Sequence, residues 1–123
     1  MKGKNLIDIR LFTRVEYTEL VSVHYEDQVF LGEIKNLSLQ GMFIALEHKI
    51  PQYAPFDVTV VFSSDESIIL NANVVRCGKT GIGIQIKHMG LSSFFHLRKA
   101  VGMQCKDLEL IIRETCMISS SIH

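Results

Sequence analysis

Hydrophobic and polar residues alternate along much of the chain between residues 20 and 86, and this pattern predicts short β-strands. In the first segment Val21, Val23 and Tyr25 share one face, and Glu26-Asp27 is predicted to form a tight turn. Further strand segments follow, each ended by turn-forming residues: residues 30–34, 42–46, 58–62, 68–74 and 82–86. Strands of this kind predict a mainly β fold, a six-stranded antiparallel β-barrel whose closure removes unpaired edges.

The period of the pattern changes near the C-terminus. Apolar residues there recur at spacings of three and four, which predicts an amphipathic helix with the stripe Phe94, Leu97, Val101, Cys105, Leu108 and Ile112. We expect one helix over residues 91–114, with Ser92 or Ser93 capping its start. Gly102 is a point where this helix can bend or split. The helix is expected to cover an open end or face of the barrel, and a helix-to-helix dimer is the alternative.

Composition limits the classes of function. The chain of 123 residues fits one domain, and 13 basic residues balance 13 acidic ones. A net charge of zero disfavours a general binder of DNA or RNA, which usually carries a basic face. Residues 1–8 lack the apolar run of a signal peptide, and no segment has the roughly 20 apolar residues that span a bilayer. We expect a cytoplasmic protein that does not insert into membranes.

No pattern of residues indicates catalysis or a metal site. The three cysteines, Cys77, Cys105 and Cys116, match no zinc spacing and are expected to be reduced thiols. The histidines lack the spacing and the acidic companion of a zinc-hydrolase helix. Gly81-Ile82-Gly83 lacks the third glycine of a dinucleotide fingerprint, so these glycines are expected to relieve strand crowding or curvature. We predict that the protein is not an enzyme and holds no cofactor or metal.

Two arginines near the N-terminus are candidates for binding an anionic ligand. Arg10 and Arg14 lie four residues apart, so in a strand or a helix both guanidinium groups can reach one ligand. A guanidinium group donates two parallel hydrogen bonds to a phosphate or to O6 and N7 of guanine, and it stacks on bases. By itself, such a pair is more often a solvated surface feature.

A polar connection at residues 36–41 is the second candidate. Asn36 and Ser38 favour turns because their side chains bond nearby backbone groups, and Gly41 supplies a positive φ if one is required. An ordinary hairpin turn is the simple interpretation. The functional interpretation is a polar shelf that offers an amide and a hydroxyl to a ligand.

Together these elements resemble the PilZ domain family of bacterial cyclic di-GMP receptors. The family pattern is R-x-x-x-R followed by [DN]-x-S-x-x-G, filled here by Arg10, Arg14, Asn36, Ser38 and Gly41. Residues 74–76 and 81–86 look like the late strand pair of the family. That pair often ends in an aromatic residue, whereas this chain has Ile86. The resemblance covers roughly residues 8–113.

The resemblance implies a PilZ-like split barrel with a flexible arginine arm. It implies that residues 1–14 form the arm, 15–90 the barrel, 91–114 the helix and 115–123 a tail, within one domain. Arg10 and Arg14 would contact guanine and phosphate of cyclic di-GMP, and residues 36–41 would contact the other guanine through Asn36 and Ser38. Arg76 is a possible supporting charge. Ile9 stands where some relatives carry another arginine, so one ligand per site is expected rather than a stacked pair.

Three other functions compete with the receptor. A protein-interaction module on the same fold, without a nucleotide, is motivated by the apolar helix face. An oligonucleotide-binding barrel is disfavoured by the neutral charge and the lack of a row of aromatic residues. An enzyme has no supporting residues. The receptor is expected to act on an unidentified downstream protein.

Overall fold

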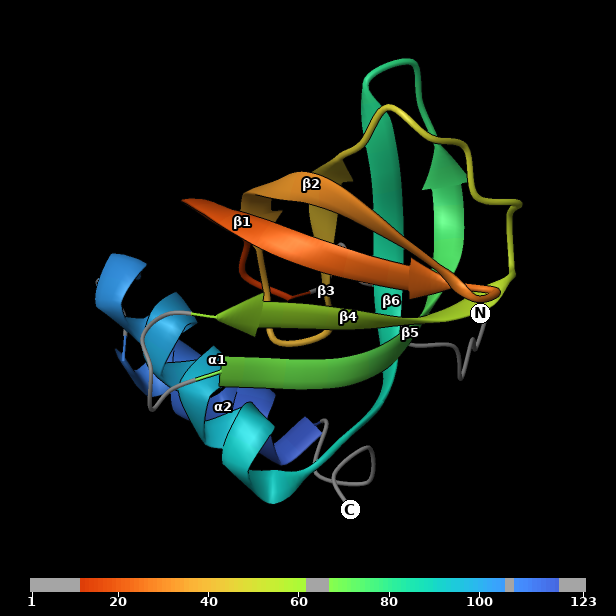
Figure 1. Ribbon diagram of the computed structural model, residues 1–123. Helices are drawn as coiled ribbons and strands as arrows, with labels where there is room; N and C mark the ends of the chain where they lie inside the picture. Colours follow the sequence, from red (N-terminus) through yellow and green to blue (C-terminus); the bar gives the residue numbers. More distant parts are fainter. Residues whose placement is uncertain (1–11, 62–66, 106–107, 118–123) are drawn as a thin grey trace, which may run out of the picture.

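The protein is described by a computed structural model over residues 12–61, 67–105 and 108–117. These residues form six strands and two helices (Figure 1). The strands are β1 (Val15–Tyr25), β2 (Gln28–Leu37), β3 (Gly41–Ala45), β4 (Pro55–Val61), β5 (Ser67–Cys77) and β6 (Gly81–Met89). The helices are α1 (Leu91–Gln104) and α2 (Leu108–Met117).

The strands close into one antiparallel barrel in the order β1-β2-β3-β6-β5-β4, with β4 paired back to β1. Alternate residues of each strand point inward and fill the barrel, among them Val23, Ile44, Val58, Val74 and Ile84, which are each fully buried. The predicted mainly β, six-stranded antiparallel barrel with a C-terminal helical region is confirmed.

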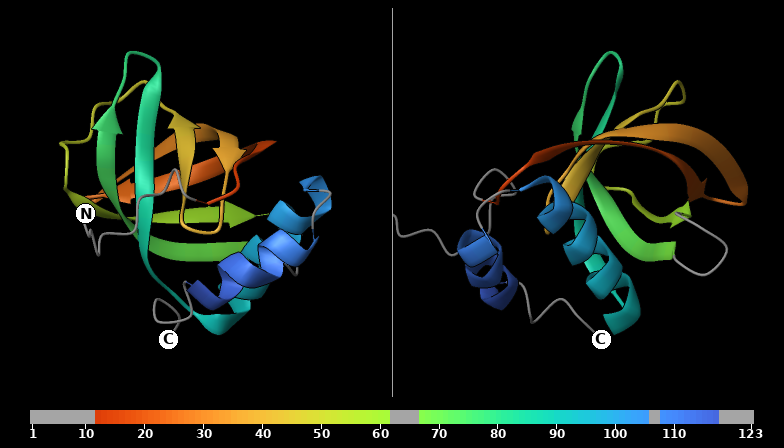
Figure 2. Two further views of the ribbon diagram at one scale, coloured as in Figure 1. Left: turned by 180° about the vertical axis from the view of Figure 1, so that it is seen from behind. Right: turned by 90° about the vertical axis from the view of Figure 1, so that its left-hand side faces the viewer.

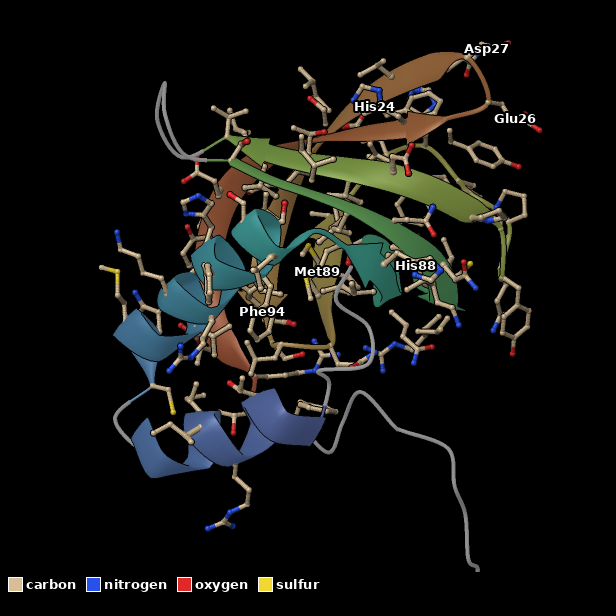
Figure 3. The ribbon with its side chains drawn as sticks, turned by 90° about the horizontal axis from the view of Figure 1, so that it is seen from below. His24, Glu26, Asp27, His88, Met89 and Phe94 are labelled. Atoms are coloured by element: carbon tan, nitrogen blue, oxygen red, sulfur yellow. The ribbon has the colours of Figure 1, made fainter. Side chains whose placement is uncertain are left out.

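The turn at Glu26-Asp27 has the backbone conformation of a tight hairpin. Both residues have positive φ, 50° and 42°, and Tyr25 pairs with Gln28 across them. Such a turn matches the right-handed twist of the strands that it joins. Figure 3 shows Glu26 and Asp27 at the tip of the β1–β2 hairpin, on the side of the molecule away from the helices.

Gly81 permits the close approach of β3 and β6. A Cβ atom at this position would lie 2.1 Å from the backbone oxygen of Ile44. Such a distance requires a backbone shift, so the barrel can close with this spacing only around glycine. This agrees with the expectation that a glycine here relieves strand crowding.

The C-terminal region differs from the single helix expected over residues 91–114. It forms α1 and α2, which meet at the connection around Cys105 and lie side by side (Figure 2). Gly102 does not split α1, because the helix continues to Gln104 and ends where the Cys105 N–H bonds the Val101 carbonyl. The expected tail at residues 115–123 also starts too early, since α2 continues to Met117, and residues 118–123 lie outside the described part.

The break between the helices resets the phase of the apolar stripe. Phe94, Leu97 and Val101 are buried as predicted, and α1 packs through them against the barrel beside β5 and β1. Among the apolar side chains of α2 whose burial is described, Ile111 is buried, whereas the predicted Ile112 is 55% exposed. A stripe extrapolated through one continuous helix therefore selects the wrong isoleucine.

Neither Ser92 nor Ser93 caps α1. Gly90 occupies the cap position and makes no side-chain cap bond, so both serines lie inside the first turn. The Ser93 hydroxyl instead accepts a hydrogen bond from the Ile69 N–H at 2.9 Å. This bond attaches the start of α1 to β5.

Candidate functional site

The turn between β2 and β3 is held together by one buried hydroxyl. The Ser38 Oγ accepts hydrogen bonds from the backbone N–H groups of Gln40 (3.2 Å) and Gly41 (3.1 Å) and donates one to the Gly41 carbonyl (3.2 Å). The Ser38 N–H also donates to that carbonyl, at 2.8 Å. Since Ser38 is 0% exposed, its hydroxyl serves the turn itself in this structure.

Gln40 attaches the same turn to β6. Its side-chain Nε2 donates to the Ile86 carbonyl at 3.2 Å, and its own carbonyl accepts from the Ile86 N–H at 2.8 Å. Gln40 is 6% exposed and Leu39 is fully buried, so this connection is packed into the barrel. Sequence reasoning gave Gln40 no role, because a glutamine in a turn signals solvent exposure unless its partner is known.

Gly41 needs no special backbone conformation. None of the glycines among the described residues has a positive φ, so the conditional role suggested for Gly41 does not apply. Gly41 is buried at the start of β3, where it pairs with Gln85 of β6. The hydrogen bonds of the Ser38 hydroxyl, rather than a positive φ at Gly41, shape the turn.

Arg14 and Asn36 meet in space. The Arg14 Nη1 donates a hydrogen bond to the Asn36 Oδ1 at 2.5 Å, and both residues are half-buried. Arg14 immediately precedes β1, and Asn36 lies near the end of β2, which pairs with β1. Arg14 of the first part of the sequence motif and Asn36 of the second therefore lie together on the barrel. Arg10 and Ile9 lie outside the described residues.

The segment before Arg14 is fixed at its last residues. Phe12 is 3% exposed and belongs to the hydrophobic core. The Thr13 N–H donates to both carboxylate oxygens of Glu114 in α2, at 3.0 and 3.1 Å, and its hydroxyl donates to one of them at 2.5 Å. Phe12 and Thr13 are thus attached to the core and to α2, while residues 1–11 lie outside the described part, so the flexible arm expected over residues 1–14 stays a prediction.

Two β-bulges align polar residues on the outer face of the barrel. The β2–β3 register shifts between Ile34 and Asn36, which places Asn36 opposite Phe43. The β5–β6 register shifts between Val74 and Arg76, which places Arg76 opposite Gly83. Each bulge adds one residue to a strand, and without it the alternation of faces would turn Asn36 and Arg76 inward.

The register then connects these residues in one row across four strands. Asn36 of β2 pairs with Phe43 of β3, Phe43 pairs with Gly83 of β6, and Gly83 pairs with Arg76 of β5. Three strand intervals separate the backbones of Asn36 and Arg76, which corresponds to roughly 14 Å. We call these four residues the outer row.

Arg76 lies over Gly83 within this row. A Cβ atom built on Gly83 would lie 3.6 Å from both Cβ and Nε of Arg76 and 3.8 Å from its Nη2. The guanidinium group therefore extends from β5 over Gly83 of β6. The outer row carries a guanidinium group near each end, from Arg14 and Arg76, with half-buried Phe43 between them.

Other chemistry is not apparent in the described part of the chain. Residues 12–61, 67–105 and 108–117 contain no group of three or more His, Cys, Asp or Glu side chains placed to hold a metal ion. In the same ranges, no helix is both long enough and apolar enough to cross a membrane.

Comparison with solved structures identifies the fold. The chain is similar to the PilZ domain of CeSA from a cellulose-synthesizing bacterium, with 22% identity, a TM-score of 0.60, and coverage of 76% of this chain and 99% of that one. It is also similar to the PilZ domain of YcgR from Escherichia coli, solved with c-di-GMP, with 15% identity, a TM-score of 0.61, and coverage of 86% and 95%.

A third similar structure is the inhibitor of motility MotI (DgrA) of Bacillus subtilis. It shares 14% identity with a TM-score of 0.62 over 90% of this chain, which spans only 53% of that protein. No curated protein sequence matches the chain. The model of the family described as PilZ domain matches residues 8–109, most of the chain. This protein therefore belongs to the PilZ domain family.

Proposed function

We propose that this PilZ domain is a receptor for cyclic di-GMP, which it binds between the arginine segment at Arg10 and Arg14 and the turn at residues 36–41. The observation that carries the proposal is the hydrogen bond between Arg14 and Asn36, which brings both parts of the motif to one surface. The similar PilZ domain of YcgR, solved with c-di-GMP, supports the choice of ligand.

Arg14 and Asn36 are the proposed recognition pair. A guanidinium group donates two parallel hydrogen bonds to guanine O6 and N7 or to a phosphate. The Asn36 amide both donates and accepts, which suits the mixed edge of a guanine. Since Arg14 bonds Asn36 in the absence of ligand, binding exchanges that bond for contacts of both side chains with the nucleotide.

Ser38 and Gly41 act in this proposal chiefly through the shape of the turn. The Ser38 hydroxyl already makes its bonds within the turn, so a direct contact with the ligand requires it to exchange one of them. The turn is attached to β6 through Gln40, and a shelf fixed in advance avoids the entropy of ordering a loop on binding.

Arg76 is the proposed support at the far end of the outer row. Its guanidinium group lies over Gly83, on the same face as Asn36 and Phe43. There it is suited to a phosphate or a base face of a ligand that spans the row. Ile9 is aliphatic and adds no further guanidinium group, so we propose one cyclic di-GMP per protomer rather than a stacked pair.

The proposed receptor acts without catalysis. Binding rearranges the arginine segment, and the change is passed to an unidentified downstream protein in the cytoplasm. The proposal involves no cofactor and no metal, and the net charge of zero disfavours DNA and RNA as partners.

Titration calorimetry with cyclic di-GMP tests this proposal. We expect binding in the low-micromolar range or tighter, near one ligand per protomer, and its loss in Arg10→Ala and Arg14→Ala. Lys35→Ala is the matched control, because Lys35 is an exposed cation paired with Glu33 and lies beside the motif. Absence of heat in the wild type would reject the receptor, and two ligands per protomer would reject the stoichiometry.

The alternative function is a protein-interaction module that does not bind the nucleotide. The observation that favours it is the set of exposed apolar residues on the helices: Leu91, Phe95, Met103 and Ile112. Two results together would favour this function over the receptor: calorimetry shows no binding of cyclic di-GMP, and the protein captures a partner equally well with and without the nucleotide.

A further inference from the structure

The two helices leave a groove between them. It has a volume of about 340 Å³ and is lined by Phe95, Arg98, Lys99, Gly102 and Met103 of α1 and by Ile111 and Ile112 of α2. The α1 residues recur at spacings of three and four, so they form one stripe beside the stripe that packs on the barrel. We call this feature the helix groove.

Large apolar side chains are exposed along the helix groove. Phe95 is 54% exposed, Met103 is 73% exposed and Ile112 is 55% exposed. Ile111 beneath them is buried. An apolar channel between two adjacent helices is the geometry that accepts one face of a third helix, through anchors at positions i, i+3, i+4 and i+7.

Gly102 keeps the middle of the groove open. A Cβ atom at this position would meet no other atom within 4 Å. Glycine costs helix stability relative to alanine, and here nothing in the neighbouring structure requires its small size. A side chain from outside can enter the space above it.

The charge of the groove indicates the character of its occupant. Arg98 and Lys99 line it, and α1 contains no acidic residue along its whole length. The described acidic residue of α2, Glu114, is buried and bonded to Thr13, so its charge does not face the groove. Among the described residues the lining is therefore apolar with Arg98 and Lys99 at one side, which complements an apolar stripe flanked by carboxylates.

We propose that the helix groove is a docking site for an amphipathic helix of a partner protein that carries acidic residues beside its apolar stripe. A second copy of this chain fits less well, because a symmetric contact would place Arg98 and Lys99 against the same residues. An anionic membrane fits less well too, since the surface is concave and its described lining holds two cations rather than a cluster of about 4–8. The proposal stands whether or not the domain binds cyclic di-GMP.

Fluorescence anisotropy with two designed helical peptides tests the proposal. Both carry Leu and Phe at positions i, i+3, i+4 and i+7, and they differ only in flanking Glu or flanking Lys. We expect the Glu peptide to bind the wild-type protein and to bind Met103→Asp, Gly102→Leu and Arg98→Glu at least roughly tenfold more weakly. Leu31→Asp is the matched control, because Leu31 is 75% exposed on β2, away from the helices, and should leave binding unchanged.

The methionine methyl groups report where the peptide binds. With methyl-labelled methionine, the resonance of Met103 should shift on titration, whereas that of Met42, which is fully buried in the barrel, should not. Equal binding of both peptides, or no binding of the Glu peptide, would overturn the proposal. The proposal would also be overturned if sedimentation showed a dimer that Met103→Asp dissociates. Binding to phosphatidylglycerol vesicles in place of the peptide would overturn it as well.

Discussion

Glu114 in α2 and Thr13 before β1 are joined by hydrogen bonds although they lie 101 positions apart in the sequence. The carboxylate is 3% exposed and accepts from the Thr13 N–H and from its hydroxyl. The residue after Thr13 is Arg14, whose guanidinium group bonds Asn36. The C-terminal helix is thereby attached to the segment that carries the candidate ligand contacts.

The first prediction concerns this attachment. Glu114→Ala leaves the Thr13 N–H without its partner in a partly buried place, so we expect a loss of about 1–3 kcal/mol in the free energy of unfolding. Thr13→Val removes only the hydroxyl and should cost less. Urea denaturation measures both. The double variant should lose less than the sum of the two, and strict additivity would show that the residues do not interact.

The second prediction concerns the close contact of β3 and β6. Gly81→Ala places a Cβ atom 2.1 Å from the Ile44 carbonyl oxygen, so it should cost about 3 kcal/mol or more in the free energy of unfolding. Gly83→Ala is the matched control in the same strand. The added Cβ atom would lie 3.6 Å from its nearest neighbours, which all belong to the Arg76 side chain. Denaturation should therefore show a far smaller loss in the free energy of unfolding. Equal losses would contradict this explanation.

The third prediction concerns the turn. Ser38→Ala removes the acceptor of the Gln40 and Gly41 N–H groups, which are buried with it. We expect destabilisation of about 1–3 kcal/mol from these unpaired donors, and weaker binding of cyclic di-GMP because the shelf loses its shape. Ser38→Thr keeps the hydroxyl and should retain more of both. Unchanged amide exchange at Gln40 and Gly41 in Ser38→Ala would refute the role given to this hydroxyl.

The fourth prediction concerns α1. Gly102→Ala should raise the free energy of unfolding by roughly 0.5–1 kcal/mol, because alanine favours the helix and restricts the unfolded chain. The added methyl group meets nothing within 4 Å. Thermal and urea denaturation measure the gain. A loss of stability would mean that the helix groove is narrower than described.

The fifth prediction concerns alkaline pH. Burial, and to a smaller extent the nearby Glu19 carboxylate, raises the pKa of Tyr17 above its ordinary value of 10.0. The folded state then holds the phenolic proton more tightly than the unfolded state, so this stabilisation is present below that value and is lost as pH rises through the raised pKa. Between about pH 9 and about pH 11, wild type should lose more stability than Tyr17→Phe. If the free energies of unfolding of wild type and Tyr17→Phe fell in parallel over this pH range, the result would contradict a raised pKa of Tyr17.

Local patterns predicted the barrel and the motif but not the contacts between distant elements. Alternation in segments such as residues 21–25 and 82–86 identifies inward-facing positions, since the period of two is local. The meeting of Arg14 with Asn36 also follows, because β1 and β2 form a hairpin. Glu114 gave no signal, as its partner lies at the other end of the chain and an acidic residue on a helix normally faces water.

The bulges and the helix break also escaped sequence reasoning, for a related reason. A strict period of two across Val74 and Arg76 would place one of them on the wrong face, and only the register with β6 reveals the extra residue. The stripe through Cys105 gave no sign of the break, so Ile112 was assigned to the core in place of Ile111. In both places, contacts between elements override a local pattern.

The central claim is that cyclic di-GMP binds on the outer row beside Arg14. Two-dimensional proton–nitrogen spectra recorded during a titration with this nucleotide test it most directly. We predict that the largest shifts occur at the Asn36 side-chain amide and at the backbone amides of Phe43, Gly83 and Arg76, and that Arg14→Ala abolishes them. No shifts at saturating nucleotide, or shifts confined to the helix groove, would contradict the account.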